Sequence, residues 1–221
     1  MQRQPEPELM DAPDQAAAYA QADFSAPHQF LVEQISRLLP KLPPAARVLD
    51  LGCGPADVTV RFARAFPGWH IDGVDGAPAM LELGRAHVAA AGLGARVRLH
   101  QAVLPGDPLP GSGYQVVLSN SLLHHLHRPQ VLWQAVRAAA APGAAVYVTD
   151  LRRPADEGSL RQLVDAYSAP EPAVLRRDFE ASLRAAFTLQ EVRAQLALAG
   201  LTNLVVTELS DRHLAVSGRA P

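Results

Sequence analysis

Hydrophobic and polar residues alternate in two ways along the middle of the chain. Short apolar runs predict five strands, at residues 47–51, 69–74, 96–103, 114–119 and 144–149. Longer segments with apolar residues on one side predict helices between them, at residues 56–66, 78–92 and 129–141. Strands that alternate with helices at this spacing indicate an α/β fold with a parallel sheet and crossover helices.

The two ends of the chain follow other patterns. Residues 1–13 are polar, acidic and rich in proline, which predicts a disordered arm. Residues 14–44 predict a helical segment with an apolar stripe, which ends at the prolines near position 40. Residues 151–187 carry helical patterns and are too long for an ordinary connection, so they predict an inserted helical cap.

Helix and strand patterns return after the predicted cap. A helix at 188–199 begins with Thr188 and Glu191 at the spacing of a capping box. Two short strands, at 204–209 and 214–216, are joined by a tight turn, so this last pair is expected to be antiparallel.

Composition narrows the class of protein. The chain has 221 residues, of which 48% are hydrophobic, so it can bury the core of one domain. A net charge of -2 and a single lysine, Lys41, give no basic surplus, and no nucleic-acid partner is expected. The only cysteine, Cys53, excludes a disulfide scaffold. Neither a signal peptide nor a membrane-spanning run is present, which favours a cytoplasmic protein without a membrane partner.

A glycine-rich turn between the first strand and the next helix is the most informative motif. Gly52 and Gly54 allow the backbone to approach a ligand closely. The dinucleotide fingerprint fails because Asp57 stands at its third glycine. Asp50, on the approach to the turn, would repel a pyrophosphate and attract a cation. S-adenosylmethionine is a nucleoside ligand of this kind, and Asp75, at the end of the second strand, could accept hydrogen bonds from its ribose hydroxyls.

At these residues the chain resembles the class I S-adenosylmethionine-dependent methyltransferases, especially the small-molecule type that includes enzymes of ubiquinone and menaquinone biosynthesis. The resemblance spans about residues 48–150 and includes the segment 119–126 after the fourth strand. It implies a Rossmann-like, mostly parallel sheet of seven strands in the order 3-2-1-4-5-7-6, with strand 7 antiparallel and helices on both faces. Residues 45–221 would then form the methyltransferase domain, and residues 14–44 a lid over the cofactor.

The resemblance also implies a set of cofactor-binding residues. They are Tyr19, Asp50, Gly52, Cys53, Gly54, Asp75, Gly76, Met80, Gln101, Ala102, Ser119 and Asn120. The chain departs from the family at Ala56, where a third glycine is common, and at Gln101 and Ala102, where an aspartate often binds the adenine amine. Cys53 is interpreted as a small residue in a tight turn and not as a nucleophile.

Methyl transfer is a direct displacement, so the enzyme mainly aligns the acceptor with the methyl–sulfur bond. A general base is needed only when the acceptor carries a proton. The candidates are His124, His125, His213 and Asp150. The histidine pair does not predict a metal site, because adjacent side chains point in different directions and no third ligand has convincing spacing.

Three arginines are expected at the rim of the acceptor site. The sheet order implied by the resemblance brings Arg152, Arg153 and Arg212 together, and guanidinium groups can hold a carboxylate or phosphate in two-point contacts. We therefore hypothesise a small-molecule acceptor that carries an anionic group. The alternative is that Arg212 pairs with Asp211 or Asp150 and only holds the rim together.

Two other functions remain open from the sequence. One is methyl transfer to RNA or protein, which the acidic balance disfavours for RNA. The other is a non-catalytic interaction module with the same fold, which the intact glycine motif with Asp50 and Asp75 disfavours. The sequence identifies neither the acceptor atom nor the oligomeric state, which could be a monomer or a homodimer.

Overall fold

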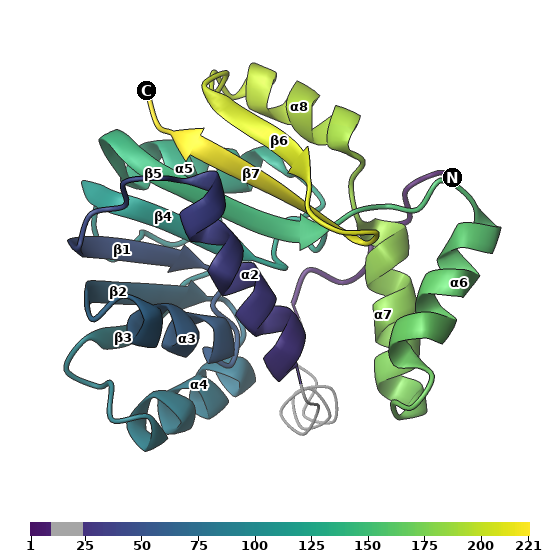
Figure 1. Ribbon diagram of the computed structural model, residues 1–221, viewed down its shortest axis with the longest axis horizontal. Helices are drawn as coiled ribbons and strands as arrows, with labels where there is room; N and C mark the ends of the chain where they lie inside the picture. The colour runs from purple at the N-terminus through teal and green to yellow at the C-terminus, as the bar shows by residue number, and fades with distance from the viewer. Residues whose placement is uncertain (10–23) are drawn as a thin grey trace.

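The computed structural model describes residues 1–9 and 24–221. One seven-stranded sheet runs through the molecule, and helices cover both of its faces (Figure 1). The elements in chain order are α2 (Ser25–Leu38), β1 (Ala45–Leu51), α3 (Asp57–Ala65), β2 (Gly68–Asp75), α4 (Pro78–Ala90), β3 (Val97–Gln101), β4 (Tyr114–Asn120), α5 (Gln130–Ala139), β5 (Ala140–Leu151), α6 (Glu157–Ser168), α7 (Ala173–Ala185), α8 (Leu189–Leu198), β6 (Leu204–Glu208) and β7 (His213–Arg219).

The strand order confirms the predicted topology. The sheet has the order β3-β2-β1-β4-β5-β7-β6. The first five strands pair in parallel, and β7 lies antiparallel between β5 and β6. The carboxyl ends of β1, β2, β4 and β5 therefore meet at one edge of the sheet, where open α/β folds bind their ligands.

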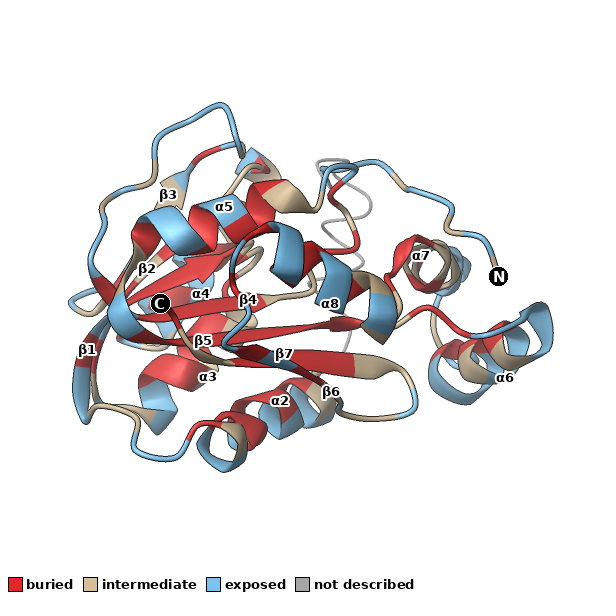
Figure 2. Cartoon of the chain, turned by 90° about the horizontal axis from the view of Figure 1, so that it is seen from above, coloured by how far each residue is buried: buried red, intermediate tan, exposed pale blue. Residues whose placement is uncertain are grey.

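Two hydrophobic cores hold the helices to the sheet. On one face, α2, α3 and α4 pack around Phe62 and Trp69, which are buried. On the other face, α5 and α8 pack around Trp133, whose indole N–H donates to the side-chain oxygen of Gln195 at 3.0 Å. Figure 2 shows the buried strands between helices whose outer sides are exposed. The helices cover both faces, so the β4 and β5 runs are apolar on both sides.

The boundary between α5 and β5 differs from the prediction. The helix was expected to reach residue 141 and the strand to begin at 144, whereas α5 ends at Ala139 and β5 begins at Ala140. Ala141 precedes Pro142, and the proline ring disfavours the helical conformation of the residue before it. Ala140 is already extended, with φ -68° and ψ 137°.

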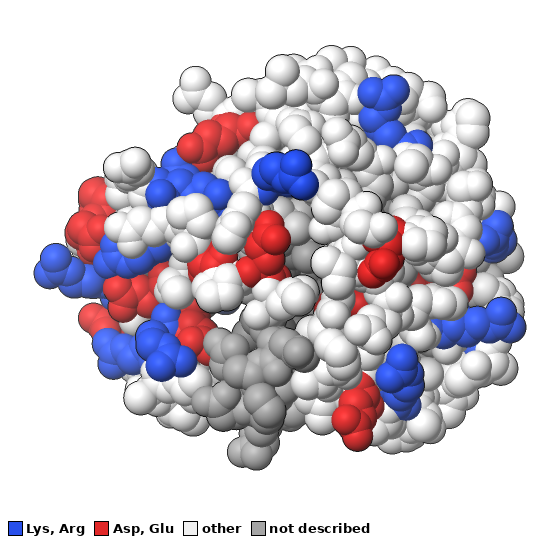
Figure 3. Space-filling model, turned by 180° about the vertical axis from the view of Figure 1, so that it is seen from behind, with Lys and Arg blue, Asp and Glu red and all other residues white. Residues whose placement is uncertain are grey.

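Residues 151–187 form a helical pair beside the sheet. The helices α6 and α7 lie side by side and enclose a small apolar core with Leu160, Val164 and Leu183. On the cap side of the face drawn in Figure 3, basic and acidic side chains are interleaved. Within the cap, Arg184 contacts Glu157 at 2.6 Å and Glu180 at 2.9 Å. None of the helices in residues 1–9 and 24–221 is long and apolar enough to cross a membrane.

Residues 1–9 do not behave as the expected disordered arm, because they lie against the cap and the sheet edge. Arg3 donates to the carbonyl oxygens of Ala185 at 2.5 Å, His124 at 2.9 Å and Leu126 at 3.1 Å. Its guanidinium also lies 4.0 Å from the centre of the Phe187 ring. The segment thus adopts a specific docked conformation, which its polar composition did not indicate.

Candidate functional site

The glycine turn between β1 and α3 has the backbone shape of a ligand-binding loop. Gly52 and Gly54 both have positive φ, 73° and 50°, which glycine adopts without steric cost. A Cβ atom on Gly52 would lie 2.8 Å from the Cβ of Leu122, whereas one on Gly54 would meet no atom within 4 Å. Gly54 therefore turns its bare backbone toward open space, where a ligand can approach closely.

Asp75 lies at the carboxyl end of β2 and organises this turn. Its Oδ2 accepts a hydrogen bond from the backbone N–H of Gly54 at 2.8 Å, and its Oδ1 accepts one from Ala77 at 2.8 Å. The backbone N–H groups of Gly52 and Cys53 donate to the carbonyl of Val74. The end of β2 and the glycine turn are thus fixed relative to one another, and Asp75 also lines the cavity described below.

Asp50 is a buried carboxylate on the approach to the turn. Its exposed fraction is 3%, and the hydroxyl of Thr59 donates to its Oδ2 at 2.6 Å. Burial raises the pKa of Asp50 to about 6; the Thr59 hydrogen bond opposes this shift and the nearby Asp75 carboxylate adds to it. A cation bound beside Asp50 would compensate for this cost of burying the negative charge.

A cavity of about 530 Å³ opens along the glycine turn and continues beneath the cap. Its volume lies in the range typical of small-molecule sites. Among the predicted site residues, the cavity is lined by Asp50, Gly52, Cys53, Gly54, Asp75, Gly76, Met80, Ala102, Asn120, His124, His125, Arg212 and His213. The predicted contact of Tyr19 lies outside the described residues.

Two predicted cofactor contacts do not reach the cavity. Gln101 is exposed on β3, and Ala102 lines the cavity in its place. Ser119 is buried within β4, where its hydroxyl donates to the carbonyl of Leu51 at 2.8 Å. Successive side chains of a strand point to opposite faces, so neighbours such as Gln101 and Ala102 cannot both face one site.

Cys53 lines the cavity but is buried and poorly suited to act as a nucleophile. Burial, together with the carboxylates of Asp50 and Asp75, raises the pKa of its thiol well above the ordinary value. A reactive cysteine requires the thiolate, which this environment disfavours. The structure therefore agrees with its interpretation as a small residue of the turn.

Asp150 does not face the cavity and instead holds His124. Its Oδ1 lies 2.5 Å from Nδ1 of His124, and its Oδ2 accepts from the backbone N–H of Leu123 at 2.7 Å. Both His124 and Asp150 are buried. Asp150 is therefore a positioning residue, and the candidate base directly exposed to a ligand must be sought among the histidines.

His213 reaches the cavity from the start of β7. Its Nδ1 lies 3.0 Å from the hydroxyl oxygen of Ser210. Burial and the positive charge of Arg212 lower the pKa of His213 to about 4, so its imidazole is neutral near pH 7 and is a weaker base than an ordinary histidine.

The predicted cluster of three arginines does not form. Arg152 contacts Glu208 at 3.0 Å and Arg153 contacts Glu191 at 2.6 Å, and neither lines the cavity. The structure thus does not bring these two predicted substrate contacts to the cavity, because carboxylates of the chain hold their guanidinium groups. Arg212 lines the cavity, contacts Asp211 at 3.2 Å and stacks over the ring of Tyr167, so it has the pairing with Asp211 that the alternative named.

Several cavity residues were not predicted from the sequence. On one side they are His28 and Leu31, from α2, and on the other they are Tyr167, Ser168, Glu171, Leu175, Asp178, Phe179 and Ser182, from the cap. Phe24, at the start of α2, also lines the cavity and belongs to the segment expected to form a lid. His28 also pairs with Asp57 at the start of α3, with 2.6 Å between Nδ1 and Oδ2. Helical periodicity indicated these helices, but it could not indicate which side faces the cavity.

Comparison with known proteins agrees with this geometry. A family model described as a methyltransferase domain matches residues 49–146. A trans-aconitate 2-methyltransferase from Paracidovorax citrulli is 30% identical over 54% of this chain and 45% of its own length. A ubiquinone biosynthesis O-methyltransferase from Bordetella pertussis is 33% identical over 48% of this chain and 43% of its own length. The chain thus matches a little less than half the length of these relatives.

A solved structure extends the likeness beyond the matched domain. The apo form of SibL, an S-adenosylmethionine-dependent methyltransferase, has a TM-score of 0.67 and 27% identity, covering 96% of this chain and 63% of that one. The open backbone at Gly54 and the carboxylates of Asp50 and Asp75 fit S-adenosylmethionine as the cofactor. Residues 49–146 thus match a methyltransferase domain, and the fold as a whole is similar to that of a solved S-adenosylmethionine-dependent methyltransferase.

Proposed function

We propose that this protein transfers the methyl group of S-adenosylmethionine to a small organic acceptor bound between the glycine turn and the cap. One observation carries the proposal: a single cavity joins Gly54 and Asp75 at the turn to His213 at the rim and Tyr167 in the cap. A cofactor on the turn and an acceptor under the cap would therefore share one enclosed space. When bound, S-adenosylmethionine supplies an electrophilic methyl group on its sulfonium.

The residues of this chain bind the cofactor, orient the acceptor and exclude water from the site. Asp75 would accept hydrogen bonds from the ribose hydroxyls, and Asp50 would stabilise the cationic part of the cofactor. The cap and α2 enclose the acceptor, which keeps water from the reacting atoms. For an acceptor that carries a proton, the neutral imidazole of His213 receives it, while His124 and His125 line the same wall.

The acceptor that we propose presents an anionic or acidic oxygen. This rests on the relatives, whose names specify trans-aconitate, a carboxylate, and O-methylation in ubiquinone biosynthesis. The arginines offer limited support, because Arg212 alone among the three predicted contacts lines the cavity and it is already paired with Asp211.

Calorimetry with S-adenosylhomocysteine tests cofactor binding directly. We expect micromolar affinity, about 8 kcal/mol, and no binding of NAD or ATP. Transfer of radiolabelled methyl groups to a panel of carboxylates and phenols then tests the reaction. For a phenolic acceptor, His213→Asn should lower kcat at least about tenfold and leave the affinity for S-adenosylhomocysteine unchanged. Binding of NAD without S-adenosylhomocysteine would refute the proposal.

A further inference from the structure

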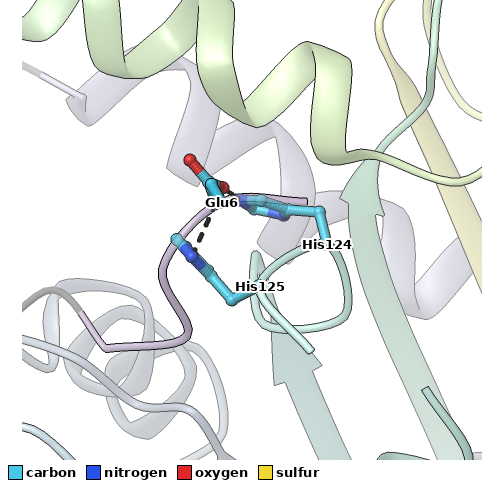
Figure 4. Close-up of side chains that lie close together, drawn as sticks. All are labelled: Glu6, His124 and His125. Carbon is cyan, nitrogen blue, oxygen red and sulfur yellow. Dashed lines mark ion pairs between the residues drawn. The ribbon is translucent and has the colours of Figure 1, made fainter. Parts of the chain in front are cut away.

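A carboxylate from the start of the chain meets the histidine pair at the cavity wall. The Oε1 of Glu6 lies 3.5 Å from Nε2 of His124 and 3.3 Å from Nδ1 of His125. One ligand atom from each residue lies within 4.8 Å of the others. Figure 4 shows the three side chains converging from two segments that are distant in the sequence.

Two polar atoms at the centre of this cluster have no hydrogen-bond partner among the described residues. Glu6 Oε1 and His125 Nδ1 are both buried, and neither forms a hydrogen bond with any residue in 1–9 or 24–221. Their separation of 3.3 Å is short enough for a hydrogen bond, but the geometry does not provide one. A buried polar atom without a partner destabilises the fold, because it has lost its hydrogen bonds to water. A cation between the two atoms would satisfy both.

The surroundings of His124 resemble those of a metal-binding histidine. A carboxylate oxygen of Asp150 lies 2.5 Å from Nδ1, which fixes the ring and directs Nε2 toward Glu6. Histidines that bind metals commonly have such a carboxylate on the other ring nitrogen. His124 is 3% exposed, so its orientation is also fixed by packing.

The segment that carries Glu6 is held in place independently. Arg3 donates to three backbone carbonyls, including those of His124 and Leu126, which belong to the loop that carries the histidines. The hydroxyl of Ser182 in α7 lies 3.3 Å from the other oxygen of Glu6. Glu6 is thus positioned toward the histidines by contacts that do not involve their imidazole rings.

We propose that Glu6, His124 and His125 form a binding site for one divalent transition-metal ion, with Zn²⁺ the best fit. Two histidines and one glutamate with an open fourth position are a ligand set of catalytic zinc sites. Tetrahedral bonds of about 2.0–2.1 Å place ligand atoms roughly 3.3 Å apart, close to the separations around Glu6. The spacing of residues in the sequence did not indicate this site, because the third ligand, Glu6, lies 118 residues before His124.

Both histidines line the cavity and Glu6 lies behind them, so the proposed ion would lie at the edge of the space assigned to the acceptor. Resting on the proposed function, the ion would bind an anionic oxygen of the acceptor, such as a carboxylate or phenolate. It would then supply the positive charge that Arg152 and Arg153 do not. Divalent cations bind such oxygens as Lewis acids and hold them in a fixed orientation.

Metal binding is tested on the full chain after dialysis against a chelator. We expect Co²⁺ to give the visible bands of a tetrahedral complex with a stoichiometry of one per chain, and Zn²⁺ to displace them. Glu6→Gln should weaken Zn²⁺ binding at least about 100-fold in competition with a chromophoric chelator. Glu8→Gln is the matched control on the same segment, because its carboxylate contacts His127 instead, and its affinity should match that of the unchanged chain.

Absence of the Co²⁺ bands in the unchanged chain would overturn the site, as would equal Zn²⁺ affinity in Glu6→Gln. Circular dichroism of each variant confirms that the fold is intact, and His125→Asn provides a second ligand variant with the same expected loss. Titration of S-adenosylhomocysteine into the metal-free chain separates this inference from the proposed function. Failure of that titration refutes the cofactor site and leaves the metal measurement valid.

Discussion

The carboxylate of Asp150, at the end of β5, lies 2.5 Å from Nδ1 of His124, in the loop after β4. The same carboxylate accepts a hydrogen bond from the backbone N–H of Leu123 at 2.7 Å. Two neighbouring parallel strands are therefore joined at their carboxyl ends through one buried side chain. This contact gives the histidine wall of the cavity a fixed geometry before any ligand binds.

Replacing Asp150 by alanine should therefore destabilise the fold. The change leaves the Leu123 N–H and the His124 ring without their acceptor in a buried place, and we expect the free energy of unfolding to fall by about 3 kcal/mol. Urea denaturation measures the loss. Asp165→Ala, which breaks an exposed pair with Arg176, should cost less than about 1 kcal/mol. Equal losses in the two variants would contradict the importance given to the buried contact.

Asp50 should make cofactor affinity depend on pH. Its pKa is raised to about 6 in the free protein, and a bound cation favours the ionised form. Affinity for S-adenosylhomocysteine should therefore be full above pH 7 and fall about tenfold by pH 5, as the carboxyl takes up a proton that must leave on binding. Calorimetry in the presence of a chelator measures the profile. Asp50→Asn should bind more weakly with a flat profile over the same range.

Ionisation of Asp50 should favour cofactor binding but lower the stability of the cofactor-free fold. The folded pKa of Asp50 lies above its ordinary value of 3.8, so folding favours the protonated form. Its favourable contribution is complete below about pH 4 and is lost as the pH rises through about 6. Asp50→Asn should thus raise the free energy of unfolding at pH 7 by up to about 3 kcal/mol without cofactor. A loss of stability at pH 7 would show that the charge is better compensated than its burial implies.

Asp75→Ala should weaken binding of S-adenosylhomocysteine at least about tenfold, because hydrogen bonds to a charged group contribute about 1.5–3 kcal/mol. The loss includes the support that Asp75 gives to Gly54 and Ala77. Calorimetry measures it against Asp72→Ala, on the same strand. Asp72 contacts Tyr114 and His100 and does not line the cavity, so that variant should retain full affinity. Unchanged affinity in Asp75→Ala would place the ribose elsewhere.

Comparison of Gly54→Ala with Gly92→Ala should separate the effect on cofactor affinity from the effect of backbone strain on stability. Gly54 and Gly92 both have positive φ, 50° and 68°, and a Cβ on either would meet no atom within 4 Å. Each substitution should therefore cost about 1 kcal/mol of stability from the left-handed backbone alone. Only Gly54→Ala should also weaken S-adenosylhomocysteine binding, because its methyl group would occupy space needed by the cofactor. Thermal denaturation and calorimetry on the same samples distinguish the two effects, and equal affinities would argue against close approach at Gly54.

Local patterns in the sequence predicted the order of strands and helices and the glycine motif. Both follow from local physics: apolar periodicity marks the elements, and the turn after β1 needs glycine for its positive φ. The capping box at Thr188 is a local signal of the same kind, and both of its hydrogen bonds are present. The strand order came from the family resemblance, and the sheet has that order.

Tertiary structure decided which charged groups face the cavity. Arg152 and Arg153 directly follow β5 in the chain. Glu208 and Glu191, from distant segments, bind their guanidinium groups and keep them out of the cavity. Glu6 illustrates the converse, because a polar segment without periodicity docks through Arg3 and brings a carboxylate to the histidines. Pairing of long side chains depends on which partners folding brings within a few ångströms, and no pattern within one segment encodes that distance.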